Sequence, residues 1–162
     1  MIKAMILAAA ALTMSTTTVD AQTMIQKNDI KVENHLMTPE ALWAMGRIGA
    51  AEASPNGKQI VYQVGYYSVK ENKGHQMLFV MDANGKNKKA LTTDAKSESD
   101  AAWIAGGQKI AFLREGQLWS MNPDGTDRKQ LTNDKLGIEG FKFSPDGKKV
   151  ILIKELPYHG TI

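Results

Sequence analysis

The chain has 162 residues, of which 43% are hydrophobic and 23% are charged, which is ordinary for one globular domain or part of a larger one. Its 20 basic and 17 acidic residues give a net charge of +3. The densest basic run, Lys86 to Lys89, lacks interleaved aromatic residues that could stack on bases, so we expect no nucleic-acid partner. There is no cysteine, which excludes disulfides, thiolate zinc sites, a cysteine nucleophile and a lipid-modified cysteine anchor.

Residues 1–21 are predicted to be a signal peptide. Lys3 supplies a positive start, an apolar run of about 11 residues follows, and Val19-Asp20-Ala21 forms a cleavage site. A membrane-spanning helix needs ~20 apolar residues, so we expect no permanent membrane anchor; the alternative is a buried N-terminal helix. We therefore expect cleavage after Ala21 and a periplasmic or secreted protein.

Residues 22–47 are predicted to form a lead-in with a short helix at 39–45. Thr38 can cap this helix, and Glu40 favours the positive end of its dipole. Trp43 lies on the helix, and we expect it to pack against the fold; the alternative is a role in binding.

The next region, residues 48–156, repeats short strands separated by glycine-containing turns. Residues 78–85 match residues 118–125 at an offset of 40 residues, and the match continues to the Leu-Thr pairs that begin at 91 and 131. This period, with four strands in each unit, is typical of a β-propeller blade. The sequence predicts blades at about 50–93, 100–133 and 140–154, and a tail at 157–162.

A second repeated element marks the turn between the first two strands of each unit. Gly57, Gly107 and Gly147 lie 50 and 40 residues apart, and each follows an Asn, Gly or Asp, as tight turns favour. The ten extra residues of the first repeat lie between Tyr62 and Met77, so we expect a longer middle hairpin there. The second strands are predicted at 59–64, 109–113 and 149–153, and the third strands at 77–81 and 117–121.

The repeats predict an all-β fold: an incomplete β-propeller with two four-stranded antiparallel blades and the first hairpin of a third. One blade cannot bury both of its faces, and ~4–8 blades close a ring. We therefore interpret the chain as part of a longer protein; the alternative is a chain that oligomerises to complete a ring. We expect incomplete cover for nine apolar residues of an isolated chain: Ile60, Tyr62, Phe79, Ile110, Phe112, Trp119, Phe143, Val150 and Leu152.

Two groups of residues resemble known families. Residues 144–149 (SPDGKK) and 118–125 (LWSMNPDG), with Leu131-Thr132, form a WD-like repeat that resembles the propellers of the Tol-system periplasmic protein and of prolyl-oligopeptidase-family serine peptidases. The lead-in residues 37–43 (MTPEALW), followed by Gly46-Arg47-Ile48-Gly49 and residues 54–58 (SPNGK), resemble the start of secreted dipeptidyl-peptidases or acylaminoacyl-peptidases of that family. The resemblance spans roughly residues 37–158.

The resemblance to the peptidases implies a propeller that precedes an α/β-hydrolase domain, covers its active site and filters peptides by size. None of the Ser-Asp-His triad carries over, because the chain contains no Gly-x-Ser-x-Gly motif. His35, His75 and His159 lie in the lead-in, the hairpin insert and the tail, and we expect His75 to be a solvent-exposed turn residue. We therefore predict no catalytic residue in this chain, whereas the parent protein is expected to be a serine dipeptidyl-peptidase or acylaminoacyl-peptidase.

No cofactor or metal site is predicted. Acidic residues such as Asp82 and Asp94 could suggest a calcium loop, but the EF-hand spacing with its closing Glu is absent. Tyr66 and Tyr67, in the insert of the first repeat, are the predicted partner contact, because loops on a rigid scaffold often carry recognition. The alternative is a longer, twisted hairpin whose tyrosines pack on its own strands.

Two functions stay open. The first is a propeller segment of a secreted serine peptidase that gates or positions peptide substrates for a hydrolase domain absent from this chain. The alternative is a non-enzymatic, Tol-like periplasmic propeller that acts as a protein-binding module. The expected partners are accordingly the missing hydrolase domain or further blades, and peptides bound by the parent protein.

Overall fold

The computed structural model describes residues 24–27 and 36–156. The predicted signal peptide, residues 1–21, and the predicted tail, residues 157–162, lie outside the described residues. The described part consists of antiparallel β-sheets and short helices, so the prediction of an all-β fold is confirmed. None of the helices in this part is long and apolar enough to cross a membrane.

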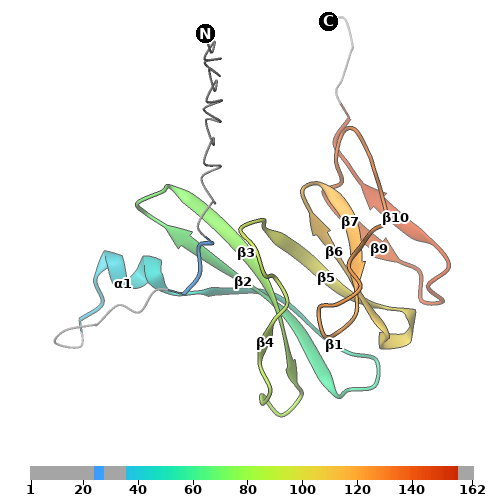
Figure 1. Cartoon of the computed structure of the whole chain (residues 1–162), viewed down its shortest axis with the longest axis horizontal. Helices are drawn as coiled ribbons and strands as arrows, with labels where there is room; N and C mark the ends of the chain where they lie inside the picture. The colour runs from blue at the N-terminus through green and yellow to red at the C-terminus, as the bar shows by residue number, and fades with distance from the viewer. Residues whose placement is uncertain (1–23, 28–35, 157–162) are drawn as a thin grey trace, which may run out of the picture.

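Three sheets follow one another along the chain (Figure 1). The first has the strand order β1-β2-β3-β4, the second β5-β6-β7-β8, and the third pairs β10 with β9. The strands of the first sheet are β1 Arg47–Ala53, β2 Gln59–Ser68, β3 Lys73–Asp82 and β4 Lys89–Ala90. Those of the other two are β5 Glu98–Ile104, β6 Lys109–Arg114, β7 Gln117–Met121, β8 Lys129–Gln130, β9 Gly140–Phe143 and β10 Val150–Ile153.

The turn between the first two strands is built in the same register in all three sheets. The equivalent pairs beside the turn are Ala53 with Ile60, Trp103 with Ile110, and Phe143 with Val150, and the second sheet adds the pair Ile104 with Lys109. Gly57, Gly107 and Gly147 have φ angles of 68°, 90° and 68°, a region that glycine enters without a Cβ clash. The predicted turns are therefore confirmed, and the degraded second copy differs by that added pair and by a short 3-10 helix, Ala105–Gly107.

The middle hairpin of the first sheet is longer than the predicted strands, which covered 59–64 and 77–81. Strands β2 and β3 pair residue by residue from Gln59 with Asp82 out to Ser68 with Lys73. The ten extra residues therefore lengthen the strands, because their backbone groups find partners across the hairpin.

The fourth strand of each four-stranded sheet has only two residues, because a threonine hydroxyl takes over the pairing. Thr92 Oγ1 accepts a hydrogen bond from the Leu78 amide at 2.9 Å, and Thr132 Oγ1 does the same for Leu118 at 2.9 Å. The repeated Leu-Thr pair thus closes each of these sheets with a side-chain contact.

The apolar core lies between neighbouring sheets. One cluster joins Val61, Leu78, Val80 and Leu91 of the first sheet and its closing segment to Trp103, Ile110, Phe112 and Met121 of the second. Ile110 and Phe112 are fully buried, so the expectation of incomplete cover is wrong for them, because the first sheet covers that face of the second. Val150 and Leu152 of the third sheet are exposed, as expected.

The lead-in helix α1, Pro39–Ala44, stands at the outer end of the first sheet (Figure 1). Thr38 Oγ1 caps it by accepting a hydrogen bond from the Ala41 amide at 3.2 Å. Ala41 is its one buried residue. Because so little of α1 is buried, most of its side chains are available to form a surface beside the β2–β3 hairpin.

Candidate functional site

The predicted contact residues Tyr66 and Tyr67 lie in strand β2, near the outer end of the β2–β3 hairpin. Tyr66 pairs with His75 and Tyr67 with Gly74, and both tyrosines are half-buried. They are strand residues on a paired backbone, not loop residues, since the insert extends the hairpin. Their positions are therefore held by the ladder of the first sheet.

Tyr67 contacts the lead-in helix. Its ring centroid lies 5.0 Å from that of Trp43, with the planes tilted by 41°, and its hydroxyl is hydrogen bonded to Asn72 Oδ1 in the hairpin turn. The guanidinium of Arg47 lies over the Trp43 ring at 4.9 Å from its centroid, within cation–π range. The hairpin, α1 and the start of β1 are thus joined by one stack of side chains.

Tyr66 packs against the chain segment that leaves α1. A Cβ atom placed on Gly46 would lie 2.7 Å from Tyr66 Cε1 and 2.7 Å from Val64 Cγ1, which is too close. Burial raises the pKa of the Tyr66 hydroxyl, so the phenol stays neutral at physiological pH. The structure therefore gives Tyr66 a packing role, and both tyrosines line a second, shallower pocket on the other side of Trp43 together with Arg47 and Gln76.

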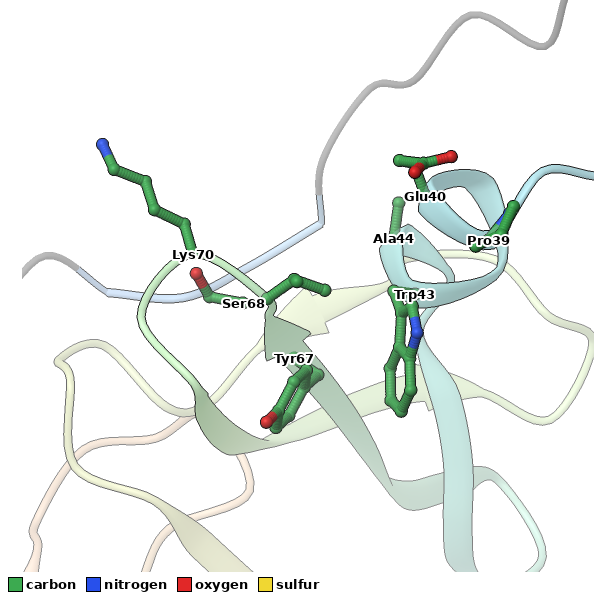
Figure 2. Close-up of a pocket in the computed structure, with 8 residues that line it drawn as sticks. Pro39, Glu40, Trp43, Ala44, Tyr67, Ser68 and Lys70 are labelled. Atoms are coloured by element: carbon green, nitrogen blue, oxygen red, sulfur yellow. The ribbon is translucent and has the colours of Figure 1, made fainter.

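A pocket of about 370 Å³ opens between α1 and the end of the hairpin. We call it the helix–hairpin pocket; Pro39, Glu40, Trp43 and Ala44 line it from the helix, and Tyr67, Ser68, Val69 and Lys70 line it from the hairpin. Figure 2 shows the rings of Trp43 and Tyr67 together, with Glu40 and Lys70 on opposite sides of the opening. The pocket thus combines aromatic walls with one carboxylate and one ammonium group.

Sequence reasoning did not assign Trp43 and Glu40 to a site. Trp43 was expected to pack, and it does contact Tyr67, but 42% of its surface is exposed. Glu40 was interpreted only as a favourable residue for the first turn of the helix. The sequence holds no signal that pairs either residue with Tyr67, because the contact joins a helix to a hairpin end through tertiary structure.

His75 is not the solvent-exposed turn residue that was expected. It lies in β3 with 3% of its surface exposed, and its Nδ1 is 2.7 Å from the carbonyl oxygen of Ile25. Its Nε2 is 3.4 Å from the carbonyl oxygen of Lys96. The longer strand carries His75 into the fold, where it holds lead-in residues against the first sheet. His35 and His159 lie outside the described residues.

A charged cluster lies between the first and second sheets. Glu98 is completely buried; Arg114 Nη1 donates to its Oε1 at 2.7 Å, Arg128 Nη1 contacts the same oxygen, and Thr92 Oγ1 donates to Oε2 at 2.8 Å. Arg114 also donates to Asp94 Oδ2 at 2.6 Å. Both oxygens of Glu98 are occupied by protein groups, so the cluster holds the sheets together and offers no open carboxylate.

No group of three or more His, Asp or Glu side chains is placed to hold a metal ion within residues 24–27 and 36–156. The helix–hairpin pocket is therefore a candidate for binding an organic group, with Trp43, Glu40, Tyr67 and Lys70 as its chemistry-bearing residues.

No protein-family model matches the chain. Over 128 residues it is 41% identical to dipeptidyl-peptidase 5 of Porphyromonas endodontalis, a match that covers 76% of this chain and 18% of that protein. It is 39% identical over 126 residues to dipeptidyl-peptidase 5 of Porphyromonas gingivalis, covering 75% of this chain and 18% of that protein. The chain therefore spans less than a fifth of the length of these relatives.

Solved structures match the fold. Acylaminoacyl peptidase of Pyrococcus horikoshii has a TM-score of 0.58 at 15% identity, over 70% of this chain and 18% of that one. The β-propeller domain of the trilobed protease of Pyrococcus furiosus has a TM-score of 0.50 at 16% identity, over 66% of this chain and 33% of that one. A putative TolB of Agrobacterium tumefaciens has a TM-score of 0.51 at 20% identity, over 64% and 36%. These likenesses show a propeller-type fold.

Proposed function

Because the chain is homologous to the N-terminal part of dipeptidyl-peptidase 5, we propose that it is the propeller segment of a serine peptidase and positions or gates peptides for a hydrolase domain absent from this chain. The observation that carries the proposal is the 41% identity over 128 residues, which is far above the identities of the fold matches. The proposal follows from homology, since the sequence contains no Gly-x-Ser-x-Gly motif from which an activity could be argued.

We propose further that the three sheets are two complete blades and the first hairpin of a third. The shared turn register, the Leu-Thr closure and the packing of each sheet on the next support this interpretation. In a closed ring, the exposed strand β10 would be covered by further strands. The predicted signal peptide at residues 1–21 would place the protein in the periplasm or outside the cell.

The first experiment is to read the coding sequence after Ile162 and to express the longer product. We expect the frame to continue into a domain with a Gly-x-Ser-x-Gly motif, and the longer product to release chromophore from a dipeptidyl chromogenic substrate. The 162-residue chain alone is the control and should show no turnover. A frame that continues only into further blades would contradict the proposal and favour a Tol-like binding module.

The gating part of the proposal has its own test. With the longer product, we expect turnover per free amino terminus to fall as the substrate grows from a short peptide to a folded protein, because a propeller over the active site restricts entry. Equal turnover across that size series would contradict gating while leaving the peptidase activity intact.

A further inference from the structure

We propose that one end of the sheets is a basic surface that binds peripherally to an anionic lipid bilayer, a role that goes beyond the function proposed above. The surface consists of the five turns that join β1 to β2, β3 to β4, β5 to β6, β7 to β8 and β9 to β10, and we call it the turn end. Because paired strands are antiparallel, the turns of each sheet lie at the same end of that sheet. Figure 1 shows both turns of the first sheet at the lower side of the view and the outer end of its β2–β3 hairpin at the upper side.

Contacts between turns make the turn end of the first two sheets one continuous surface. The Ala83 amide donates a hydrogen bond to the Lys58 carbonyl oxygen at 2.8 Å, which joins the two turns of the first sheet. Lys89 Nζ donates to the Asp124 carbonyl oxygen at 2.6 Å, which joins the first sheet to the second. The turns of these two sheets are therefore held side by side.

Charge is distributed unevenly between the two ends of the sheets. The turn end contains six basic and three acidic residues, a net charge of +3, in residues 54–58, 83–88, 105–108, 122–128 and 144–149. The opposite end contains four basic and six acidic residues, a net charge of −2, in residues 69–72, 91–97, 115–116, 131–139 and 154–156. The described part of the chain thus presents its excess positive charge at one end.

The unpaired charge of the turn end is positive. Its five lysines are exposed and have no ion-pair partner in the part of the chain that the structure describes: Lys58, Lys86, Lys88, Lys148 and Lys149. The three aspartates of the turns, in contrast, are engaged. Asp124 and Asp146 each accept a hydrogen bond of 2.6 Å from a hydroxyl of their own turn, and Asp127 pairs with Lys109.

The chemistry of the turn end fits an extended anionic surface better than other anionic partners. None of its turns contains an aromatic residue, so unpaired bases would have nothing to stack on. Its one arginine, Arg128, pairs with Glu98, so it is not available for bidentate contacts with phosphates or bases. The cavity between the β3–β4 and β7–β8 turns is lined by Asp82 and Asp124 as well as Lys89, so a small free anion would meet like charge there. Exposed lysines on several turns can instead contact many lipid headgroups at once, and each contact adds to the attraction.

The experiment is cosedimentation of the 162-residue chain with vesicles that contain phosphatidylglycerol and phosphatidylcholine, or phosphatidylcholine alone. The neutral vesicles give the baseline, which includes any contribution of the apolar run near the N-terminus. We expect binding to the anionic vesicles to be at least about tenfold tighter than to the neutral ones. The difference should disappear as sodium chloride is raised from ~50 mM to ~500 mM, because salt screens exposed charges. Inorganic phosphate at the concentration of the lipid phosphate, with ionic strength held constant, should not displace the chain.

A triple variant tests the location of the surface. Lys58→Gln with Lys86→Gln and Lys88→Gln removes three unpaired lysines from the turns of the first sheet. We expect it to bind the anionic vesicles about tenfold more weakly than the parent chain. The side chains are exposed, so the midpoint of urea unfolding should stay that of the parent chain.

The matched control is Lys70→Gln with Lys73→Gln and Lys135→Gln. It removes three exposed lysines from the opposite end, and its net charge equals that of the first triple variant. None of the three has an ion-pair partner within the described residues, so this variant should also keep the parent's urea midpoint. We expect its affinity for the anionic vesicles to stay within about twofold of that of the parent chain.

Equal weakening in the two triple variants would show that only net charge matters and would overturn the proposal. Anionic vesicles that bind no more tightly than neutral ones, or displacement by inorganic phosphate, would do the same. A duplex oligonucleotide and a polyglutamate peptide are compared with the vesicles at equal concentrations of negative charge, and tighter binding of either one would assign the surface to that partner instead. The peptidase proposal is tested separately, since the longer gene product can cleave dipeptidyl substrates whether or not the turn end binds lipid.

Discussion

The junction between the first and second sheets and the junction between the second and third occupy equivalent places in the repeat, but different chemistry holds them. At the first, Glu98 is buried among Arg114, Arg128 and Thr92. At the second, the residue 40 positions later is Ile138, which packs on Ala111, Leu113 and Leu118 with 4% of its surface exposed. The same backbone position therefore accepts either a fully paired carboxylate or an apolar side chain.

An ion pair outside this position is common to both junctions. Arg114 pairs with Asp94 at 2.6 Å in the first, and Lys154 pairs with Asp134 at 2.7 Å in the second. Each pair links the segment that closes one sheet to the end of the second strand of the next. Both junctions thus have a partly exposed ion pair at the same place in the repeat and differ in the buried residue beneath it. We infer that the buried residue sets how strongly two sheets are held together.

The largest effect is expected for Glu98→Gln. Within the described part of the chain, Glu98 is the only buried acidic residue that faces Arg114 and Arg128. The substitution removes its charge, and the two guanidinium groups, which are largely buried, keep theirs. Breaking a buried ion pair on one side costs about 3 kcal/mol or more, and we expect the free energy of unfolding to fall by about 3 kcal/mol. Urea unfolding followed by tryptophan fluorescence measures it.

The matched control for Glu98→Gln is Glu115→Gln. Glu115 pairs with Lys96 at 2.7 Å, but both side chains are about half exposed, so its loss should cost less than about 0.5 kcal/mol. A cost below about 1 kcal/mol for Glu98→Gln would mean that the buried cluster does not hold the first junction.

Truncating Ile138, the central residue of the second junction, should lower the free energy of unfolding by less than Glu98→Gln does. Ile138→Ala removes buried methyl groups, which typically costs ~2–5 kcal/mol, and we expect about 2 kcal/mol because the third sheet is exposed on its other side. The matched control is Ile151→Ala in β10, where 69% of the residue is exposed and the cost should stay under about 0.5 kcal/mol. An equal loss in the two variants would show that the third sheet does not dock on the second in solution.

The sequence predicted the turn between the first two strands of each sheet and missed the buried charge between two sheets. The turns are local, since Asn-Gly and Asp-Gly specify a tight turn without help from the rest of the chain. Glu98 lies between Ser97 and Ser99 in a polar stretch, and its arginine partners are 16 and 30 residues away, so nothing local marks it as buried. Burial here is a property of the docked sheets.

The candidate site likewise has a part that the sequence predicted and a part that it missed. The insert in the first repeat pointed to Tyr66 and Tyr67, because an extra segment shows directly against a repeat of fixed length. The contact of Tyr67 with Trp43, and the burial of His75 against Ile25, depend on how the lead-in folds back onto the hairpin. Tertiary packing of a non-repeated segment leaves no periodic signal in the sequence.

A smaller effect should appear in the pH dependence of stability, through the partly exposed ion pairs of Asp94 and Asp134. Burial acts to raise the pKa of Asp94, but the hydrogen bond from Arg114 and the nearby positive charges outweigh it, and the net pKa is lowered from 3.8. A lowered pKa in the folded state stabilises the fold above pH 3.8, and that contribution disappears as the pH falls through the folded-state value. The hydrogen bond from Lys154 lowers the pKa of Asp134 in the same direction.

We therefore expect Asp94→Asn to be less stable than the parent chain at pH 7, by under about 1 kcal/mol because the carboxylate is half exposed. The difference should shrink as the pH is lowered from about 5 towards 2. Asp134→Asn should show the same trend. Urea unfolding at a series of pH values checks both variants, and a difference that grows in acid would contradict the assigned sign.

The smallest net change is expected when the first junction is rebuilt in the chemistry of the second. A triple variant, Glu98→Ile with Arg114→Met and Arg128→Met, replaces all three charges at once, so no buried charge is left unpaired. Apolar replacement of a whole buried ion cluster is often neutral, because the removed desolvation cost offsets the lost attraction. We expect the free energy of unfolding of the triple variant to lie within about 1 kcal/mol of that of the parent chain. The triple variant should also be more stable than Glu98→Gln alone. If it is less stable than Glu98→Gln, the two arginines contribute contacts of their own, and the hydrogen bond from Arg128 to the Leu91 carbonyl oxygen at 2.6 Å would be the first of these to test.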